Sequence, residues 1–121
     1  MSKTILVVDD CQNIREIVAF TLENIGYNIV TAVDGEDALQ SINNKHFDLI
    51  ITDVNMPKKD GIELIKEVRA LERYKYLPIL LLTTEDEPNK KQLAKDAGAT
   101  GWLTKPFVVQ TFVSTVKKVL Q

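Results

Sequence analysis

The feature that most limits the fold of this chain is a regular alternation of short apolar runs with longer amphipathic segments. The runs predict five β-strands, at residues 4–8, 28–32, 49–53, 77–83 and 101–104. After each run, apolar residues recur at helical spacing, which predicts five helices. Strands that alternate with helices favour an α/β fold of three layers, in which right-handed crossovers join parallel strands and helices cover both faces of the sheet.

Local signals mark where several helices begin or end. Gly26 is placed to end the first helix, while the stretch 34–37 opens the second. Asp60 with Glu63 resembles a capping box at the start of the third. The fourth helix, from Glu85, is very polar, and we expect it to be short, exposed and mobile, with an inner face made only of Leu93, Ala94 and Ala97.

Size and composition exclude several classes of protein. With 121 residues, of which 45% are hydrophobic, the chain predicts a single domain over residues 1–121. A net charge of -2 predicts no direct binding to nucleic acid, and the absence of a long apolar run predicts no membrane insertion. The start of the chain leads into a strand rather than a signal peptide, so we expect a cytoplasmic protein. Cys11, the only cysteine, is expected to be a small buried residue.

Polar or charged side chains stand at the exits of four of the five predicted strands. The carboxyl ends of parallel strands meet at one edge of a sheet, which is where functional groups gather in this class of fold. We therefore expect these residues to converge: Asp9, Asp10, Asp53, Thr83, Thr84 and Lys105.

Three carboxylates at one edge predict a binding site for a cation. They would repel one another, and a divalent ion with oxygen ligands relieves that repulsion. Mg²⁺ fits best because it is bound by one or two carboxylates and keeps several waters, and Mn²⁺ can substitute for it. Asp10 and Asp53 are the expected direct ligands, and Asp9 is expected to orient waters or Asp10.

The same group of residues predicts chemistry on a phosphoryl group. Next to a cation, the carboxylate of Asp53 can act as a nucleophile toward phosphorus. Lys105 could hold one phosphoryl oxygen, and the hydroxyl of Thr83 could donate a hydrogen bond to another. The predicted product is an aspartyl phosphate.

The motifs that carry this reading resemble those of a known family. Asp9-Asp10, Asp53 within DVNMPKKDG, Thr83 and the stretch GWLTKPF are similar to the receiver domain of bacterial response regulators, above all its single-domain CheY type. The resemblance covers essentially the whole chain. It implies a flavodoxin-like sheet with strand order 2-1-3-4-5, and a cis peptide bond before Pro106.

The resemblance also implies roles for individual residues. Asp53 would be the phosphoacceptor, and Asp9, Asp10, Asp53 and the backbone carbonyl of Asn55 would surround the metal. Thr83 and Lys105 would sense the phosphoryl group. The family catalyses only its own phosphorylation and dephosphorylation, so we expect no enzyme with a separate substrate.

Partners follow from the same resemblance. The phosphoryl group would come from a phosphohistidine on a sensor histidine kinase. Because no DNA-binding segment follows Gln121, we expect the output to pass through a downstream protein: a flagellar motor in chemotaxis, a signalling enzyme, or a histidine phosphotransfer protein in a phosphorelay.

The expected switch involves Thr83, Thr84 and Trp102. Phosphorylation adds charge that can draw Thr83 inward, and the space it leaves would let the aromatic side chain at position 102 change rotamer. Trp102 replaces the tyrosine or phenylalanine that is more frequent in the family, so the alternative is that it stays outside and anchors a partner. Thr84 is larger than the residue the family often has, which predicts slower access to the phosphoryl group.

Two other classes of function share part of this pattern. A haloacid-dehalogenase-type phosphatase also uses an aspartate nucleophile at a strand end, but it needs a second aspartate two residues later, where this chain has Asn55. A flavin-binding electron carrier needs hydroxyl and glycine donors in its first loop, where Asp9, Asp10 and Cys11 stand instead.

Overall fold

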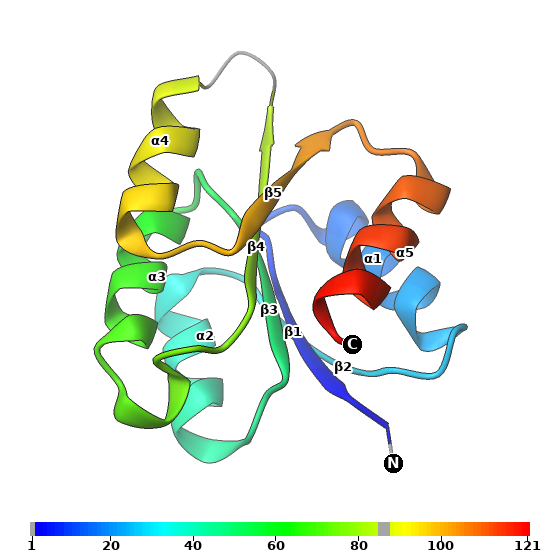
Figure 1. The fold of residues 1–121 in the computed structure, drawn as a ribbon, viewed down its shortest axis with the longest axis horizontal. Helices are drawn as coiled ribbons and strands as arrows, with labels where there is room; N and C mark the ends of the chain where they lie inside the picture. The colour runs from blue at the N-terminus through cyan, green and yellow to red at the C-terminus, as the bar shows by residue number, and fades with distance from the viewer. Residues whose placement is uncertain (1, 85–87) are drawn as a thin grey trace.

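A computed structural model of the chain describes residues 2–84 and 88–121, and in it five strands form one parallel sheet in the order β2-β1-β3-β4-β5 (Figure 1). This confirms the predicted fold class and strand order. The elements are β1 (Thr4–Val8), α1 (Gln12–Glu23), β2 (Asn28–Ala32), α2 (Gly35–Asn44), β3 (Leu49–Asp53), α3 (Gly61–Arg69), a short 3₁₀-helix (Glu72–Tyr74), β4 (Ile79–Thr84), α4 (Pro88–Ala97), β5 (Gly101–Lys105) and α5 (Val109–Val119).

The register of the sheet decides which residues leave it together. Val8 at the end of β1 pairs with Thr52 of β3, so the chain leaves β1 beside Asp53. Asp53 in turn pairs with Leu82 of β4, one residue before Thr83. At the far side, Thr84 pairs with Lys105 at the end of β5. The strand exits therefore share one edge, as the parallel arrangement predicts.

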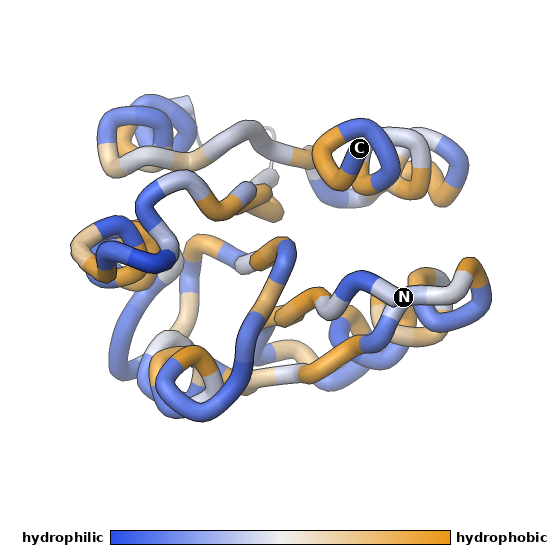
Figure 2. Tube along the Cα trace, turned by 60° about the horizontal axis from the view of Figure 1, so that its bottom comes forward, coloured by the Kyte–Doolittle hydropathy of each residue, from blue (hydrophilic) through white to orange (hydrophobic). Residues whose placement is uncertain are grey.

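Helices cover both faces of the sheet, so the molecule has two apolar cores. Helices α2, α3 and α4 lie on one side of the strands, and α1 and α5 lie on the other (Figure 1). Along β1, Leu6 and Val8 belong to the first core, while Ile5 and Val7 belong to the second. All four are fully buried, which explains why the strand is apolar without alternation. Figure 2 shows the hydrophobic stretches gathered where helices and strands face one another.

The predicted helix signals act as expected. The side chain of Asp34 accepts a hydrogen bond from the Asp37 amide and caps α2, and that of Asp60 accepts one from the Glu63 amide, at 2.9 Å in both cases. Gly26 follows α1 with a φ of 101°, a left-handed conformation that glycine adopts without strain. The peptide bond between Lys105 and Pro106 is cis, as expected.

Some boundaries and buried faces differ from the prediction. Strand β4 begins at Ile79 rather than residue 77, because the preceding Pro78 has no amide hydrogen for the ladder. Helix α4 begins at Pro88, and the predicted start at Glu85 lies outside the described residues. Leu93 was predicted to face inward, but it is 50% exposed, and Ala94 is the buried residue of α4.

The 3₁₀-helix after α3 was not predicted. The hydroxyl of Tyr74, a fully buried side chain in this turn, accepts a hydrogen bond from the Phe47 amide and donates one to the Lys45 carbonyl, both at 3.1 Å. The turn thereby fixes the end of the sheet opposite the strand exits. In the described part of the chain, none of the helices has the length and apolar character needed to cross a membrane.

Candidate functional site

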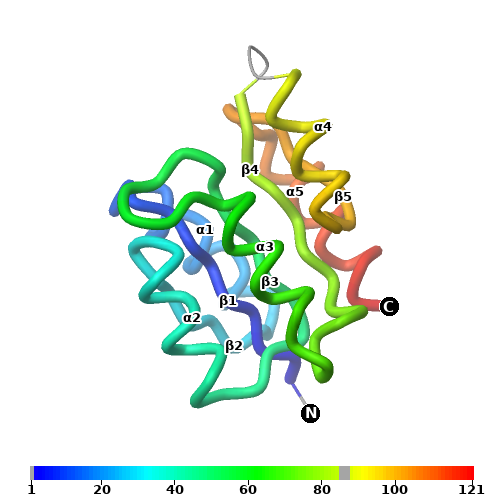
Figure 3. The backbone as a smooth tube through the Cα atoms, turned by 90° about the vertical axis from the view of Figure 1, so that its left-hand side faces the viewer, coloured from blue at the N-terminus to red at the C-terminus, as the bar shows by residue number. Residues whose placement is uncertain are grey.

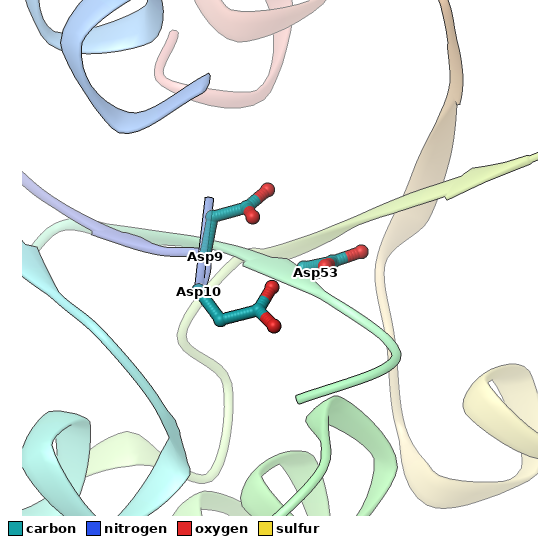
Figure 4. Close-up of side chains that lie close together, drawn as sticks. All are labelled: Asp9, Asp10 and Asp53. Carbon is teal, nitrogen blue, oxygen red and sulfur yellow. The ribbon is translucent and has the colours of Figure 1, made fainter. Parts of the chain in front are cut away.

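The ends of β1 and β3 bring three carboxylates together. Asp9 and Asp10 directly follow β1, and Asp53 is the last residue of β3. Each contributes a carboxylate oxygen to a group whose members lie within 4.8 Å of one another. Figure 4 shows the three side chains extending in the same direction from their strands. The predicted acidic cluster is therefore present in the structure.

Lys105 provides the positive charge of this cluster. Its Nζ atom lies 3.1 Å from Oδ2 of Asp9 and 3.2 Å from Oδ1 of Asp53. Asp9 is fully buried and the Asp53 side chain is 14% exposed, so both ion pairs are largely shielded from water. The prediction that Lys105 lies beside an acidic partner is confirmed, across 96 residues of sequence.

Two further contacts hold Asp9 in place. Its Oδ1 atom accepts a hydrogen bond from the Cys11 amide at 2.9 Å, and its backbone carbonyl accepts one from Nη1 of Arg15 at 2.7 Å. Arg15 was not singled out from the sequence. The available signal was an arginine on the first turns of the helix that follows the acidic pair, where its side chain can reach back to the strand end. Arg15 thus orders the backbone beside Asp10.

Asp53 is fixed by its neighbours on β3 and in the following loop. Its Oδ1 atom accepts a hydrogen bond from the Val54 amide at 2.9 Å, in addition to the contact with Lys105. Its backbone carbonyl accepts a hydrogen bond from the Thr52 hydroxyl, also at 2.9 Å. The carboxylate is therefore held in one orientation, as a reacting group must be.

The cluster contains three carboxylates and one ammonium group, so negative charge exceeds positive charge. Burial raises the pKa of Asp53 above its ordinary value and the nearby Asp9 raises it further, against the opposing effect of Lys105. Burial alone would lower the pKa of Lys105, but Asp53 and the hydrogen bond to Asp9 outweigh burial and raise it. One ammonium group thus only partly neutralises the acids, and additional positive charge would stabilise them.

Thr83 and Thr84 lie on β4 at the same edge of the sheet. Thr83 is almost fully buried, with 1% of its surface exposed, and its hydroxyl lies 3.4 Å from the backbone carbonyl of Thr84. Thr84 is partly exposed at the end of the strand. Their predicted position is confirmed, whereas their part in a switch stays a prediction.

Trp102 and Asn55 are both accessible. The Trp102 side chain is 45% exposed on β5, and the Nζ atom of Lys91 lies 5.7 Å from its ring centroid. An exposed ring with a cation over it matches the alternative in which this residue stays outside. Asn55 is exposed in the loop after β3, two residues beyond the acidic side chain of Asp53.

The prediction for Cys11 is wrong. It was expected to be buried, but it is exposed at the N-cap position of α1. Asp10 and Cys11 are both exposed, and the amide of Cys11, rather than its thiol, makes the contact with the buried Asp9.

The donor set fits a hard divalent cation. Carboxylate oxygens from two strand ends face one space, and the exposed residue Asn55 follows Asp53 by two residues in the adjoining loop. Mg²⁺ prefers such oxygen ligands and retains waters on its open side. The residues that could hold it are Asp10, Asp53 and the carbonyl of Asn55, with Asp9 engaged by Lys105.

Comparisons of the sequence and of the fold with known proteins point to one family. The family model of the response regulator receiver domain matches residues 5–117. Among solved structures, the chemotaxis protein CheY4 of Vibrio cholerae superimposes with a TM-score of 0.94 at 48% sequence identity, covering 99% of this chain and 100% of that one.

Two curated relatives differ in length. The chemotaxis protein CheY of Pseudomonas aeruginosa is 38% identical over 118 residues, which are 97% of this chain and 95% of that protein. The alkaline phosphatase synthesis transcriptional regulatory protein PhoP of Bacillus subtilis is 42% identical over the whole chain, which spans 50% of PhoP. Receiver domains are signalling proteins that interact with histidine kinases and downstream targets. On its sequence, its fold and its acidic cluster, the chain belongs to the response regulator receiver domain family.

Proposed function

We propose that this chain is a single receiver domain, over residues 1–121, that works as a stand-alone response regulator in a two-component system. It accepts a phosphoryl group from a sensor histidine kinase on Asp53 and then changes its affinity for a downstream protein. The observation that carries the proposal is the contact of one ammonium group, that of Lys105, with both Asp9 and Asp53 at the exit of the sheet.

The proposed chemistry uses groups that already face one another. A carboxylate oxygen of Asp53 forms a bond to phosphorus as the bond from phosphorus to the imidazole nitrogen of the donor breaks. The other ring nitrogen of the donor carries a proton, so the products are a neutral imidazole and an aspartyl phosphate. The Lys105 ammonium can donate a hydrogen bond to an oxygen of the incoming phosphoryl group, since it already lies 3.2 Å from Asp53. The hydroxyl of Thr83 can donate to another phosphoryl oxygen. The chain catalyses this transfer on itself alone, and also the later reaction of the aspartyl phosphate with water, which gives back the carboxylate and releases inorganic phosphate.

A bound Mg²⁺ ion, or Mn²⁺ in its place, would supply charge that offsets the negative charge of the transferring group. We assign it to Asp10, Asp53 and the carbonyl of Asn55, with Asp9 in support. Asp9 is held by the Cys11 amide and by Lys105, so it suits the task of orienting Asp10 or the waters of the ion.

The similarity to CheY proteins of comparable length supports an output in chemotaxis through a partner protein, with the flagellar motor as the first candidate. We propose that the exchange takes place in the cytoplasm. Thr83, Thr84 and Trp102 would transmit the phosphorylated state to the surface of β5.

The test is intact mass spectrometry after incubation with acetyl phosphate, with and without Mg²⁺. We expect the wild-type chain to gain one phosphoryl group only with Mg²⁺, and the Asp53→Asn variant to gain none. A gain in Asp53→Asn, or an equal gain in the presence of a chelator, would contradict the proposal. Turnover of a generic phosphate ester that survives the change Asp53→Asn would instead favour an enzyme with a separate substrate.

A further inference from the structure

The loop between β3 and α3, residues 54–60, is a closed and tightly turned segment. Its two ends meet, because the Gly61 amide donates a hydrogen bond of 2.8 Å to the Val54 carbonyl. At its tip, the Lys59 amide donates one of 2.7 Å to the Pro57 carbonyl, and Lys58 has a left-handed φ of 66°. A loop closed at its base and turned at its tip moves as a unit, so a displacement of Lys59 reaches Asn55.

Two neighbouring helices hold the tip of this loop. The Gly35 amide, in the first turn of α2, donates a hydrogen bond of 3.2 Å to the Lys59 carbonyl. The side chain of Lys59 forms an ion pair with Glu67 of α3. Figure 3 shows the loop crossing over the start of α2 before α3 begins. The first turn of a helix has amides without intrahelical partners, and here one of them serves to fix the loop.

Space, rather than backbone conformation, requires glycine at position 35. A β-carbon there would lie 2.6 Å from the carbonyl oxygen of Lys59 and 2.8 Å from its β-carbon, closer than such atoms approach. The left-handed glycines of the described chain are Gly26 and Gly98, whereas Gly35 is buried in the first turn of α2. Alanine would suit that helical backbone better than glycine does. What alanine would disturb is the contact with the loop.

We propose that Gly35 is a positioning residue for the cation site, acting through the loop 54–60. By leaving room for the Lys59 carbonyl at the start of α2, it holds in place the loop that carries Asn55, the residue whose carbonyl we assign to the cation. This inference rests on the proposed function, because it assigns Gly35 a part in the same cation site. It makes the start of α2, which contributes no ligand, a determinant of cation affinity.

The first experiment is calorimetric titration with Mg²⁺ of the wild-type chain, Gly35→Ala and Gly101→Ala. The control has the same substitution on β5, where a β-carbon would lie 3.6 Å from Leu80 in ordinary contact. We expect Gly35→Ala to lose about tenfold in Mg²⁺ affinity, the lower end of what displacing a supporting group costs a metal site. Gly101→Ala should change the affinity by less than about twofold.

The outcomes separate this inference from the proposed function. Wild-type affinity in Gly35→Ala would overturn the inference while leaving the cation site in place. Failure of the wild-type chain to bind Mg²⁺ would overturn both. An equal loss in Gly101→Ala would show a general effect of the substitution and would also overturn the inference.

A second measurement needs no variant and covers the case in which Gly35→Ala does not fold. If the contact of Gly35 with the loop favours the cation, the cation must favour that contact by the same factor. Saturating Mg²⁺ should therefore slow hydrogen exchange of the Gly35 amide by about tenfold relative to the Phe47 amide at the other end of the sheet. Equal slowing of both amides would contradict the inference.

Discussion

Replacing Lys105 by methionine should destabilise the fold, because the ammonium group now offsets the repulsion between Asp9 and Asp53. Methionine keeps most of the length of the side chain but leaves Asp9 and Asp53 without their shared cation. At separations of 3.1 and 3.2 Å, each ion pair has a Coulomb attraction of about 5 kcal/mol at an effective dielectric constant of 20. Between Asp9 and Asp53, whose oxygens lie within 4.8 Å, the repulsion is at least about 3.5 kcal/mol on the same scale.

Those gross energies are reduced by solvation. Removing one partner of a fully buried pair costs about 3–5 kcal/mol. The Lys105 side chain is 20% exposed, so we expect the free energy of unfolding at pH 7 to fall by about 2–3 kcal/mol. Urea unfolding followed by circular dichroism in the presence of a chelator measures this difference. The matched control is Lys118→Met at an exposed position of α5, which should stay within about 0.5 kcal/mol of wild type.

The loss of stability in Lys105→Met should also depend on pH. Without Lys105, the charge and the hydrogen bond by which that residue lowers the pKa of Asp53 are lost, so the pKa rises further above the unfolded value of 3.8. A carboxyl group whose folded pKa is raised destabilises the fold above that pKa and ceases to do so as the pH falls through it. The deficit of Lys105→Met should therefore be largest at neutral pH and shrink as the pH falls toward the unfolded value of 3.8. A deficit that is independent of pH, or below about 0.5 kcal/mol, would refute this reasoning.

Three other predictions concern single residues. Asp53→Asn should raise the free energy of unfolding of the metal-free protein at pH 7, because the substitution removes a buried carboxylate whose pKa is raised; an unchanged or lower value in urea unfolding with a chelator would show that Lys105 already balances the site. Tyr74→Phe should cost about 1–3 kcal/mol in the same assay, since the Phe47 amide and the Lys45 carbonyl lose their buried partner, and an unchanged unfolding midpoint would contradict that role. If Trp102 changes rotamer in the switch, its fluorescence should respond to Mg²⁺ with acetyl phosphate, and an unchanged spectrum with Asp53 demonstrably modified would exclude it from the switch.

The sequence was sufficient to predict the fold and the members of the acidic cluster. Asp53 ends an apolar run, and Asp9 and Asp10 follow another, so a parallel arrangement was enough to place them at one edge. Lys105 was predicted to join them on the same ground. The placement of these residues needed only local patterns and one topological rule, whereas the strand order came from the resemblance to the receiver-domain family.

The remaining contacts depend on how distant segments pack, which local periodicity does not contain. Ile17 fits a helical apolar pattern, yet it is 50% exposed because the stripe of α1 that faces the sheet runs through Val18 and Leu22. The hydrogen bond from Arg15 to the Asp9 carbonyl and the approach of Gly35 to Lys59 likewise join residues whose sequence patterns are unrelated. For such residues, the contacts seen in the structure, rather than the local sequence pattern, explain why that residue type is present.

The central claim, that a phosphoryl group is carried by Asp53, is tested most directly by locating the modification. The wild-type chain would be treated with Mg²⁺ and a phosphohistidine donor, reduced with borohydride to convert the acyl phosphate to homoserine, and mapped by peptide mass spectrometry. We predict homoserine at position 53 and at no other aspartate, with none formed in a chelator. Homoserine at position 9 or 10, or a phosphoryl group found on Thr83 or on another hydroxyl, would contradict the account.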